Sequence, residues 1–143
     1  MSPATLFRDL SRSSRDVLDD SRAFEIDALL QQGLPIGVAM KLFESRQVPK
    51  DVRPAMLGSS LRTLQRKLAK DTALSPSEGA NLIESIRLID RATEVIGSLA
   101  AALKWLQAEI RSLGGRRPME LLNTPIGRRE VERILGRIEY GVY

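Results

Sequence analysis

SPSEGANLIESIRLIDRATEVIG, residues 75 to 97, predicts a long helix. Ser75 and Glu78 have the spacing of a capping box, Pro76 stands at the favoured first helical position, and Gly97 is a typical stop. Between these signals one stripe recurs at three- and four-residue spacing: Leu82, Ile83, Ile86, Ile89, Ala92, Thr93 and Ile96. A helix of about five turns suits a bridge between two modules. Its stripe is a candidate surface for a homodimer.

The segment before this helix is strongly basic. Residues 46 to 70 carry seven Lys and Arg residues against Asp51 alone, whereas acidic and basic residues are nearly balanced on either side. Such a concentration is the electrostatic footprint of a nucleic-acid contact, although a solvated surface can produce the same count.

Within this basic segment the pattern is a short helix, a tight turn and a second helix. Asp51 is a plausible N-cap of the first helix, which would place Pro54 at its third position. Ala55, Met56 and Leu57 supply its apolar side. Gly58 breaks the helix, and Ser60 can cap the second one, whose predicted buried face is Leu61, Leu64 and Leu68.

The outer face of the second helix has the residue types of a DNA-recognition helix. Arg reads guanine edges and Gln reads adenine edges, while Lys and Thr hold phosphates. We therefore predict a DNA-binding set of Arg53, Arg62, Thr63, Gln65, Arg66, Lys67 and Lys70. An ordinary amphipathic surface helix would also place Arg and Gln outside, so both interpretations stay open.

Two further helices are predicted toward the N-terminus. The first covers residues 24 to 32, with Phe24 among its apolar positions and Gly33 closing it. Pro35 suits the first turn of the second, which ends near Arg46. Residues 1 to 22 mix charged and Ser residues and predict a mobile or loosely docked arm.

Three helices are predicted toward the C-terminus. Ser98 can cap the first, with an inner face of Leu99, Ala102, Leu103, Leu106 and Ile110 and with Trp105 beside it. Gly114 and Gly115 make a turn before Pro118, which opens a short helix carrying Met119, Leu121 and Leu122. Thr124 with Pro125 opens the last helix, whose predicted inner positions are Ile126, Val131, Ile134, Leu135 and Ile138.

Composition excludes several classes of function. The 143 residues include neither Cys nor His, which removes disulfides, thiolate sites, His-based catalysis and nearly all zinc sites. Neither a membrane-length apolar run nor a signal-peptide core is present, and no alternating β pattern is seen. We predict an all-α, cytoplasmic, non-enzymatic protein without a cofactor, a metal or a membrane partner.

The last six residues, IEYGVY, are unusually apolar for a chain end. They either fold back onto their own domain or contact a partner protein. Trp105 leaves a similar choice, because it anchors a local core if buried and is a binding hot spot if exposed.

Several motifs together resemble one family. They are GLP (33–35), LGSSLRTLQRKL (57–68), IDRATEVIG (89–97), ALKWL (102–106), LGGRRP (113–118), ELLNT (120–124) and RIEYGVY (137–143). In this order the chain resembles the Xre-type antitoxins of RES–Xre toxin–antitoxin systems. The resemblance departs at Pro54 and at residues 108 to 112, which lack the family's Pro-Asn turn, so the helix after Ser98 would be free to run longer.

The resemblance implies a helix-turn-helix domain at 23–75 that binds the operon's own promoter, a bridging helix at 76–97, and a toxin-binding domain at 98–143. The partner would be a RES-domain toxin that consumes NAD⁺, with its active-site cleft covered by the antitoxin. The implied toxin-binding residues are Trp105, Arg116, Arg117, Arg137, Glu139, Tyr140, Gly141, Val142 and Tyr143. Glu139 would approach cationic groups of the NAD⁺ pocket, and the two tyrosines would exclude water.

Two other interpretations belong to different classes. A stand-alone transcriptional regulator would use its C-terminal half only to dimerise, and would not copurify with a RES-domain protein. A helical scaffold without a DNA role would show no salt-dependent DNA binding.

Overall fold

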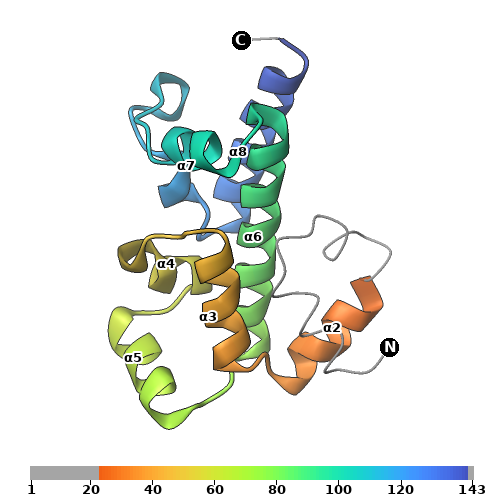
Figure 1. Cartoon of the computed structure of the whole chain (residues 1–143), viewed down its shortest axis with the longest axis vertical. Coiled ribbons are helices and arrows are strands. Elements are labelled where there is room, and N and C mark those ends of the chain that lie inside the picture. The colour runs from red at the N-terminus through yellow and green to blue at the C-terminus, as the bar shows by residue number, and fades with distance from the viewer. Residues whose placement is uncertain (1–22, 142–143) are drawn as a thin grey trace. The chain divides into compact units, whose positions relative to one another are not determined.

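The computed structural model describes residues 23–141, so the predicted arm at 1–22 and the predicted toxin contacts Val142 and Tyr143 lie outside the described residues. Within that range the all-α prediction is confirmed, and no strand is formed. Figure 1 labels the α-helices. With η used here for 3-10 turns, the elements in chain order are α2 (Ala23–Gln32), α3 (Ile36–Ser45), η3 (Lys50–Val52), α4 (Arg53–Leu57), α5 (Leu61–Lys70), α6 (Pro76–Ile96), α7 (Leu99–Leu106), η4 (Arg111–Leu113), η5 (Pro118–Leu121) and α8 (Pro125–Glu139).

The chain forms two compact units, and the boundary between them falls within α6. The N-terminal unit comprises residues 1–83, described from residue 23, and the C-terminal unit comprises residues 84–143.

The N-terminal unit packs α2 to α5 around the first turns of α6. Its fully buried apolar residues include Leu34, Leu42, Phe43, Met56, Leu57, Leu74 and Leu82, and the Arg46 side chain is buried as well. The backbone N–H of Leu74 donates to the carbonyl of Leu34 at 2.9 Å, which ties the approach to α6 to the α2–α3 turn. Gly79 allows α2 close to α6, because a Cβ there would lie 2.7 Å from Leu30 Cδ2.

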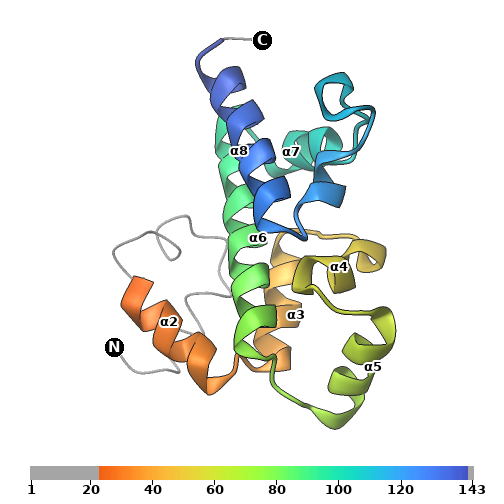
Figure 2. The same cartoon turned by 180° about the vertical axis from the view of Figure 1, so that it is seen from behind.

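The C-terminal unit packs α7, η5 and α8 against the remainder of α6. Figure 2 shows α8 running beside α6, as Figure 1 does from the other side. Ser85 Oγ on α6 donates to the carbonyl of Leu122 at 3.1 Å, which joins α6 to the turn before α8. The buried core residues include Ile86, Ile89, Ala92, Ala102, Leu106, Met119, Leu122, Val131 and Leu135.

The predicted helix boundaries are mostly confirmed. Ser60, Ser98 and Thr124 each accept the backbone N–H three residues later, at 3.0 to 3.1 Å. The capping box is formed in both directions, with Ser75 N donating to Glu78 Oε1 at 2.9 Å and Glu78 N donating to Ser75 Oγ at 3.1 Å.

The prediction for the short basic helix is wrong at its start. Asp51 lies inside the 3-10 turn η3, and α4 begins two residues later with Val52 at the N-cap. Pro54 lacks an N–H and is therefore accommodated in the first turn of α4, where it is buried. Ala55, expected on the apolar side, is exposed.

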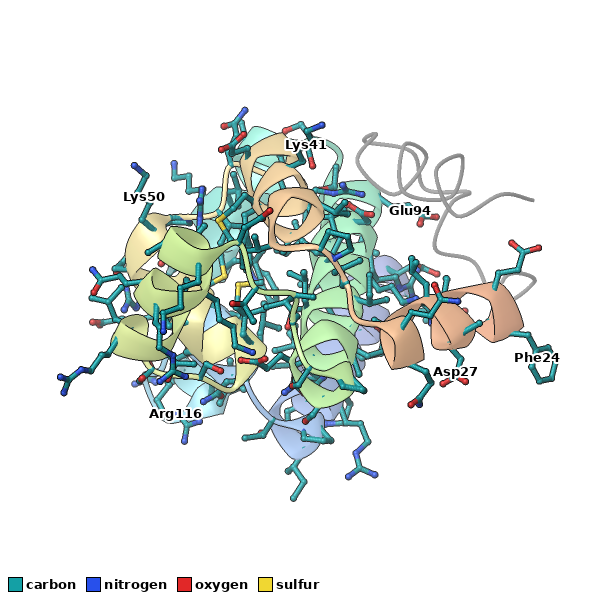
Figure 3. All side chains as sticks on the ribbon, turned by 90° about the horizontal axis from the view of Figure 1, so that it is seen from below. Phe24, Asp27, Lys41, Lys50, Glu94 and Arg116 are labelled. Atoms are coloured by element: carbon teal, nitrogen blue, oxygen red, sulfur yellow. The ribbon has the colours of Figure 1, made fainter. Side chains whose placement is uncertain are left out.

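The predicted buried face of α5 is also wrong, because only Leu64 is buried. Leu61 is 56% exposed and Leu68 is 44% exposed, since the core meets this ten-residue helix only at its centre. Two other apolar predictions fail similarly. Phe24 is 93% exposed and points outward from α2 in Figure 3, and Ile126 is 70% exposed because it lies opposite Val131 and Leu135 on α8.

The helix after Ser98 does not run longer, contrary to the prediction. It ends at Leu106, and Ile110 leaves the helix to form an isolated antiparallel bridge with Arg116, its N–H donating to the Arg116 carbonyl at 3.1 Å. Gly114 and Gly115, at φ of +68° and +81°, make the turn between them. This turn replaces the final helical turn that residues 108 to 112 were expected to supply.

The α6 stripe does not offer the predicted dimer surface. Leu82, Ile83, Ile86, Ile89 and Ala92 are all buried within the chain. A homodimer therefore has to use another surface.

Candidate functional site

The first candidate surface is the outward side of α5. Arg62, Gln65, Arg66 and Lys70 are exposed there, and we call them the α5 basic face. The helix contains no acidic residue, so its exposed side carries only positive charge. Thr63 is half-buried, and its hydroxyl accepts a hydrogen bond from Ser60 Oγ at 3.0 Å.

Lys67 and Arg53 belong to the predicted DNA-binding set, but each has a partner within the chain. Lys67 Nζ forms an ion pair with Glu78 Oε1. Arg53 lies over the ring of Phe43, 5.3 Å from its centroid, and its Nε donates to the Val48 carbonyl at 3.1 Å. Both cations would have to give up or share these contacts in order to reach a phosphate.

Glu78 is the centre of what we call the Glu78 network. Its carboxylate accepts hydrogen bonds from Lys67 on α5, from Ser59 in the α4–α5 turn, and from the backbone N–H of Ser75. Burial alone would raise the pKa of this carboxyl, but the hydrogen bonds from Lys67, Ser59 and Ser75 outweigh burial and lower it to about 2. The capping role of Glu78 was readable from the sequence, whereas its partners 11 and 19 residues earlier were not.

The second candidate surface is the C-terminal end of α8. Tyr140 follows the helix directly and is 78% exposed, and Gly141 comes next at φ +69°. Glu139, the last helical residue, accepts a hydrogen bond from Arg91 Nη1 at 2.5 Å. Its carboxylate is therefore already engaged within the chain.

Arg91 on α6 also binds a second carboxylate of α8, with Arg91 Nε 3.1 Å from Glu132 Oε1. Burial alone would lower the pKa of Arg91, but Glu132 and Glu139 raise it overall. This arginine belongs to the IDRATEVIG motif, but the sequence carries no local signal of its two partners on α8. Its contacts pin the last two turns of α8 to α6.

The remaining predicted toxin-binding residues lie in the same unit but on different elements. Trp105 on α7 is half-buried, whereas Arg116 and Arg137 are exposed. Arg117 Nε donates to Glu120 Oε1 at 2.8 Å, and its Nη1 donates to Gln107 Oε1 at 3.2 Å. Arg116 is labelled in Figure 3. The predicted residues are therefore distributed over α7, the Gly114–Gly115 turn and the end of α8.

Residues 23–141 contain no group of three acidic side chains that could hold a metal ion. In the same range no helix is long and apolar enough to cross a membrane.

Comparison with known proteins identifies the family. Residues 91–141 match the Antitoxin Xre/MbcA/ParS C-terminal toxin-binding domain. An antitoxin Xre of Yersinia enterocolitica is 30% identical over 142 residues, covering 99% of this chain and 95% of that protein. The chain belongs to the Xre antitoxin family. Antitoxins Xre of Photorhabdus laumondii and Pseudomonas putida are 26% and 28% identical, covering 82% and 88% of this chain and 80% and 78% of those proteins.

Membership of the Xre antitoxin family makes the chain a toxin-binding antitoxin and not an enzyme. The matched domain begins at Arg91 and therefore includes both partners of each Arg91 ion pair. Every described residue that was predicted to bind a toxin lies between 91 and 141.

Proposed function

We propose that this antitoxin neutralises a RES-domain, NAD⁺-consuming toxin by inserting its C-terminal residues into the toxin's active-site cleft, and that it represses its own promoter through α5. The exposed Tyr140 at the end of the pinned helix α8 is the observation that carries the first part. An exposed aromatic side chain at a fixed position suits a pocket on a partner.

Because of the Arg91 ion pairs, we assign insertion into the cleft to residues after Glu139 and not to Glu139 itself. Glu139 is engaged by Arg91, so it orients the end of α8, while Tyr140 and residues 141–143 enter the cleft. The tail starts from a fixed helix end, which lowers the entropy lost when it binds.

Two truncations test the tail. A chain ending at Glu139 keeps both Arg91 ion pairs and loses only residues 140–143, whereas a chain ending at Arg137 also loses the Glu139 contact. Coexpressed with a RES-domain toxin, both truncated chains should fail to protect cellular NAD⁺ and growth, while the full chain protects them. Protection by the chain that ends at Glu139 would refute the blocking role of the tail.

For the DNA-binding part, we propose that Arg62, Gln65 and Arg66 read base edges, and that Lys70 and Thr63 contact phosphates. Arg53 and Lys67 contribute less than their charge suggests, because both have partners within the chain. Operator half-sites are usually matched by protein dimers, so we expect a homodimer formed through a surface other than the α6 stripe.

Gel shifts on the promoter fragment test this assignment. Arg62→Ala and Arg66→Ala should each weaken sequence-specific binding about tenfold or more, because each good base contact is worth roughly 1–3 kcal/mol. Lys70→Ala should weaken specific and non-specific binding alike and lower the salt slope by about one. Unchanged promoter affinity in both arginine variants would remove the α5 basic face from the proposal.

The domain division follows the same proposal. We assign DNA binding to residues 23–75 and bridging to residues 76–97. Toxin binding is assigned to residues 98–143, and the family match at 91–141 supports a toxin-binding role for this part of the chain.

A further inference from the structure

The outward side of α8 carries a regular stripe of which the tail proposal uses only the last member, Tyr140. Its members recur at three- and four-residue spacing and are all exposed: Ile126, Arg129, Arg133, Arg137 and Tyr140. We call this set the α8 stripe. The opposite side of the helix is buried and consists of Gly127, Val131, Ile134 and Leu135. The stripe therefore faces solvent, while the opposite side of α8 packs into the core of the C-terminal unit.

The charges around the stripe are unevenly divided. Arg133 Nη2 pairs with Glu130 Oε2 at 2.7 Å, and Arg133 and Arg137 lower the pKa of Glu130. Glu132 and Glu139, the other two acidic residues of α8, are turned toward Arg91 on a different flank of the helix. Three arginines thus face solvent against one adjoining carboxylate.

The two ends of the stripe are apolar and well exposed. Ile126 and Tyr140 are separated by 14 residues, which corresponds to about 21 Å along a helix axis. Arg and Tyr are the residue types that most often carry the binding energy of an interface, and exposed apolar groups gain when a partner covers them. The stripe has the pattern of a binding surface with a cationic centre and apolar ends.

We propose that the α8 stripe docks onto an acidic face of the toxin, outside the active-site cleft, with Arg129, Arg133 and Arg137 facing Asp and Glu side chains and Ile126 in an apolar hollow. The partner is argued from position, because the stripe lies wholly inside the toxin-binding domain at 91–141. Duplex DNA fits less well, since Glu130 adjoins the stripe and apolar groups end it. The proposal rests on the proposed function for the RES-domain identity of the toxin.

The test measures binding of the full-length chain to a purified RES-domain toxin at low and high salt. The double variant Arg129→Glu/Arg133→Glu should weaken binding roughly 100-fold and slow association, with the difference shrinking at high salt. Arg129→Gln/Arg133→Gln, which adds no like-charge pair beside Glu130, should weaken it roughly tenfold. Ile126→Ser should cost about five- to tenfold with no salt dependence.

Lys41→Glu is the matched control, because Lys41 is exposed on α3 in the N-terminal unit and the change in net charge per site is the same. It should leave toxin affinity within about twofold, and circular dichroism melting should show that all variants fold. Equal binding of wild-type and stripe variants would overturn the stripe alone. Loss of promoter binding with intact toxin binding would make the stripe a DNA surface and would also overturn it. Failure of the wild-type chain to bind the RES-domain toxin would instead overturn the proposed function, and the stripe proposal with it.

Discussion

Helices α5 and α8 both present arginines to solvent, yet the protein holds them in place by different means. Helix α5 buries only Leu64 and is tied to α6 through Lys67 and the Glu78 network. Helix α8 buries four residues in close packing, and Arg91 adds ion pairs with Glu132 in its middle and Glu139 at its end. A helix held by polar contacts responds to charge and pH, whereas a helix held by packing responds to volume. The two candidate binding surfaces should therefore fail under different perturbations.

The largest loss of stability is expected from a substitution at the position where α8 packs most closely. A Cβ at Gly127 would lie 2.1 Å from the Leu121 carbonyl oxygen, so Gly127→Ala must displace backbone. We expect a loss of about 3 kcal/mol or more in the free energy of unfolding of the C-terminal unit, measured by urea denaturation. Gly136→Ala on the same helix is the control, because nothing lies within 4 Å of its Cβ position. It should stabilise by up to about 1 kcal/mol. Similar results for the two variants would show that α8 is not held by close packing.

The corresponding change for α5 is Glu78→Ala. It removes a helix cap and leaves the largely buried ammonium of Lys67 without its carboxylate, so we expect a loss of about 2–3 kcal/mol in denaturation. Glu84→Ala is the control on the same helix, since its ion pair with Arg87 is longer, at 3.5 Å, and its carboxylate is half exposed. That control should cost under about 0.5 kcal/mol. Equal costs would mean that the Glu78 network does not hold α5.

Acid should weaken the N-terminal unit in a defined pH window. The pKa of Glu78 is about 2 in the folded chain and near 4.3 in an unfolded one, so the unfolded chain takes up the proton first. The contribution of Glu78 is complete above about pH 4.5 and is lost as the pH falls toward 2, by about 2 kcal/mol after allowance for solvent screening. The measurement is unfolding free energy against pH for wild type and Glu78→Gln.

Comparing wild type with Glu78→Gln separates the pH dependence due to Glu78 from that due to other acidic groups. Glu120 and Glu130 also have lowered pKa values, through Arg117 and Arg133, but both proteins share them. Parallel pH curves for the two proteins would contradict the Glu78 assignment.

Promoter binding distinguishes two roles of Glu78, because they predict opposite changes in the promoter affinity of Glu78→Gln. If Glu78 matters only as a negative charge near DNA, Glu78→Gln should strengthen binding. If it positions α5 through Lys67, the same change should weaken specific binding about tenfold, although Gln still suits the capping box. Lys67→Met should then cost a similar factor, and the double variant should cost no more than either single change. Gel shifts with specific and non-specific DNA decide between the two signs.

The sequence predicted the elements better than their surroundings, for a physical reason. Caps and glycine stops are local, so Ser60, Ser98, Thr124 and the end of α6 at Gly97 were found correctly. Burial depends on what lies opposite, so Leu61 and Ile126 were placed inside by periodicity although no element within residues 23–141 covers them. Helical periodicity identifies a possible inner face but not how much of it the core reaches.

Prediction of the binding surfaces from the sequence was limited in the same way, because it missed contacts between distant residues. Residue type and charge identified the α5 basic face from the sequence alone. Lys67 pairs with Glu78, 11 positions away, and is therefore less available to a phosphate. Glu139 pairs with Arg91, 48 positions away. No local sequence signal predicts pairs at such separations. Arg91 belongs to the IDRATEVIG motif, but only the fold shows that it reaches both Glu132 and Glu139.

The smallest effect on stability is expected at Arg91, where α8 does use ion pairs. The side chains are partly exposed, so Arg91→Ala should cost only about 1 kcal/mol of unfolding free energy. Toxin affinity should fall further, by roughly tenfold, because an unpinned helix end must be ordered when the tail binds. Arg91→Lys keeps the charge but cannot reach both carboxylates in the forked geometry, and should recover only part of the loss. Glu132→Gln removes one pair and leaves Glu139 held, so its affinity should stay near that of wild type. If the Arg91→Ala chain binds the toxin as tightly as wild type, the tail does not need the end of α8 to be fixed. The difference between α5 and α8 would then affect stability but not toxin binding.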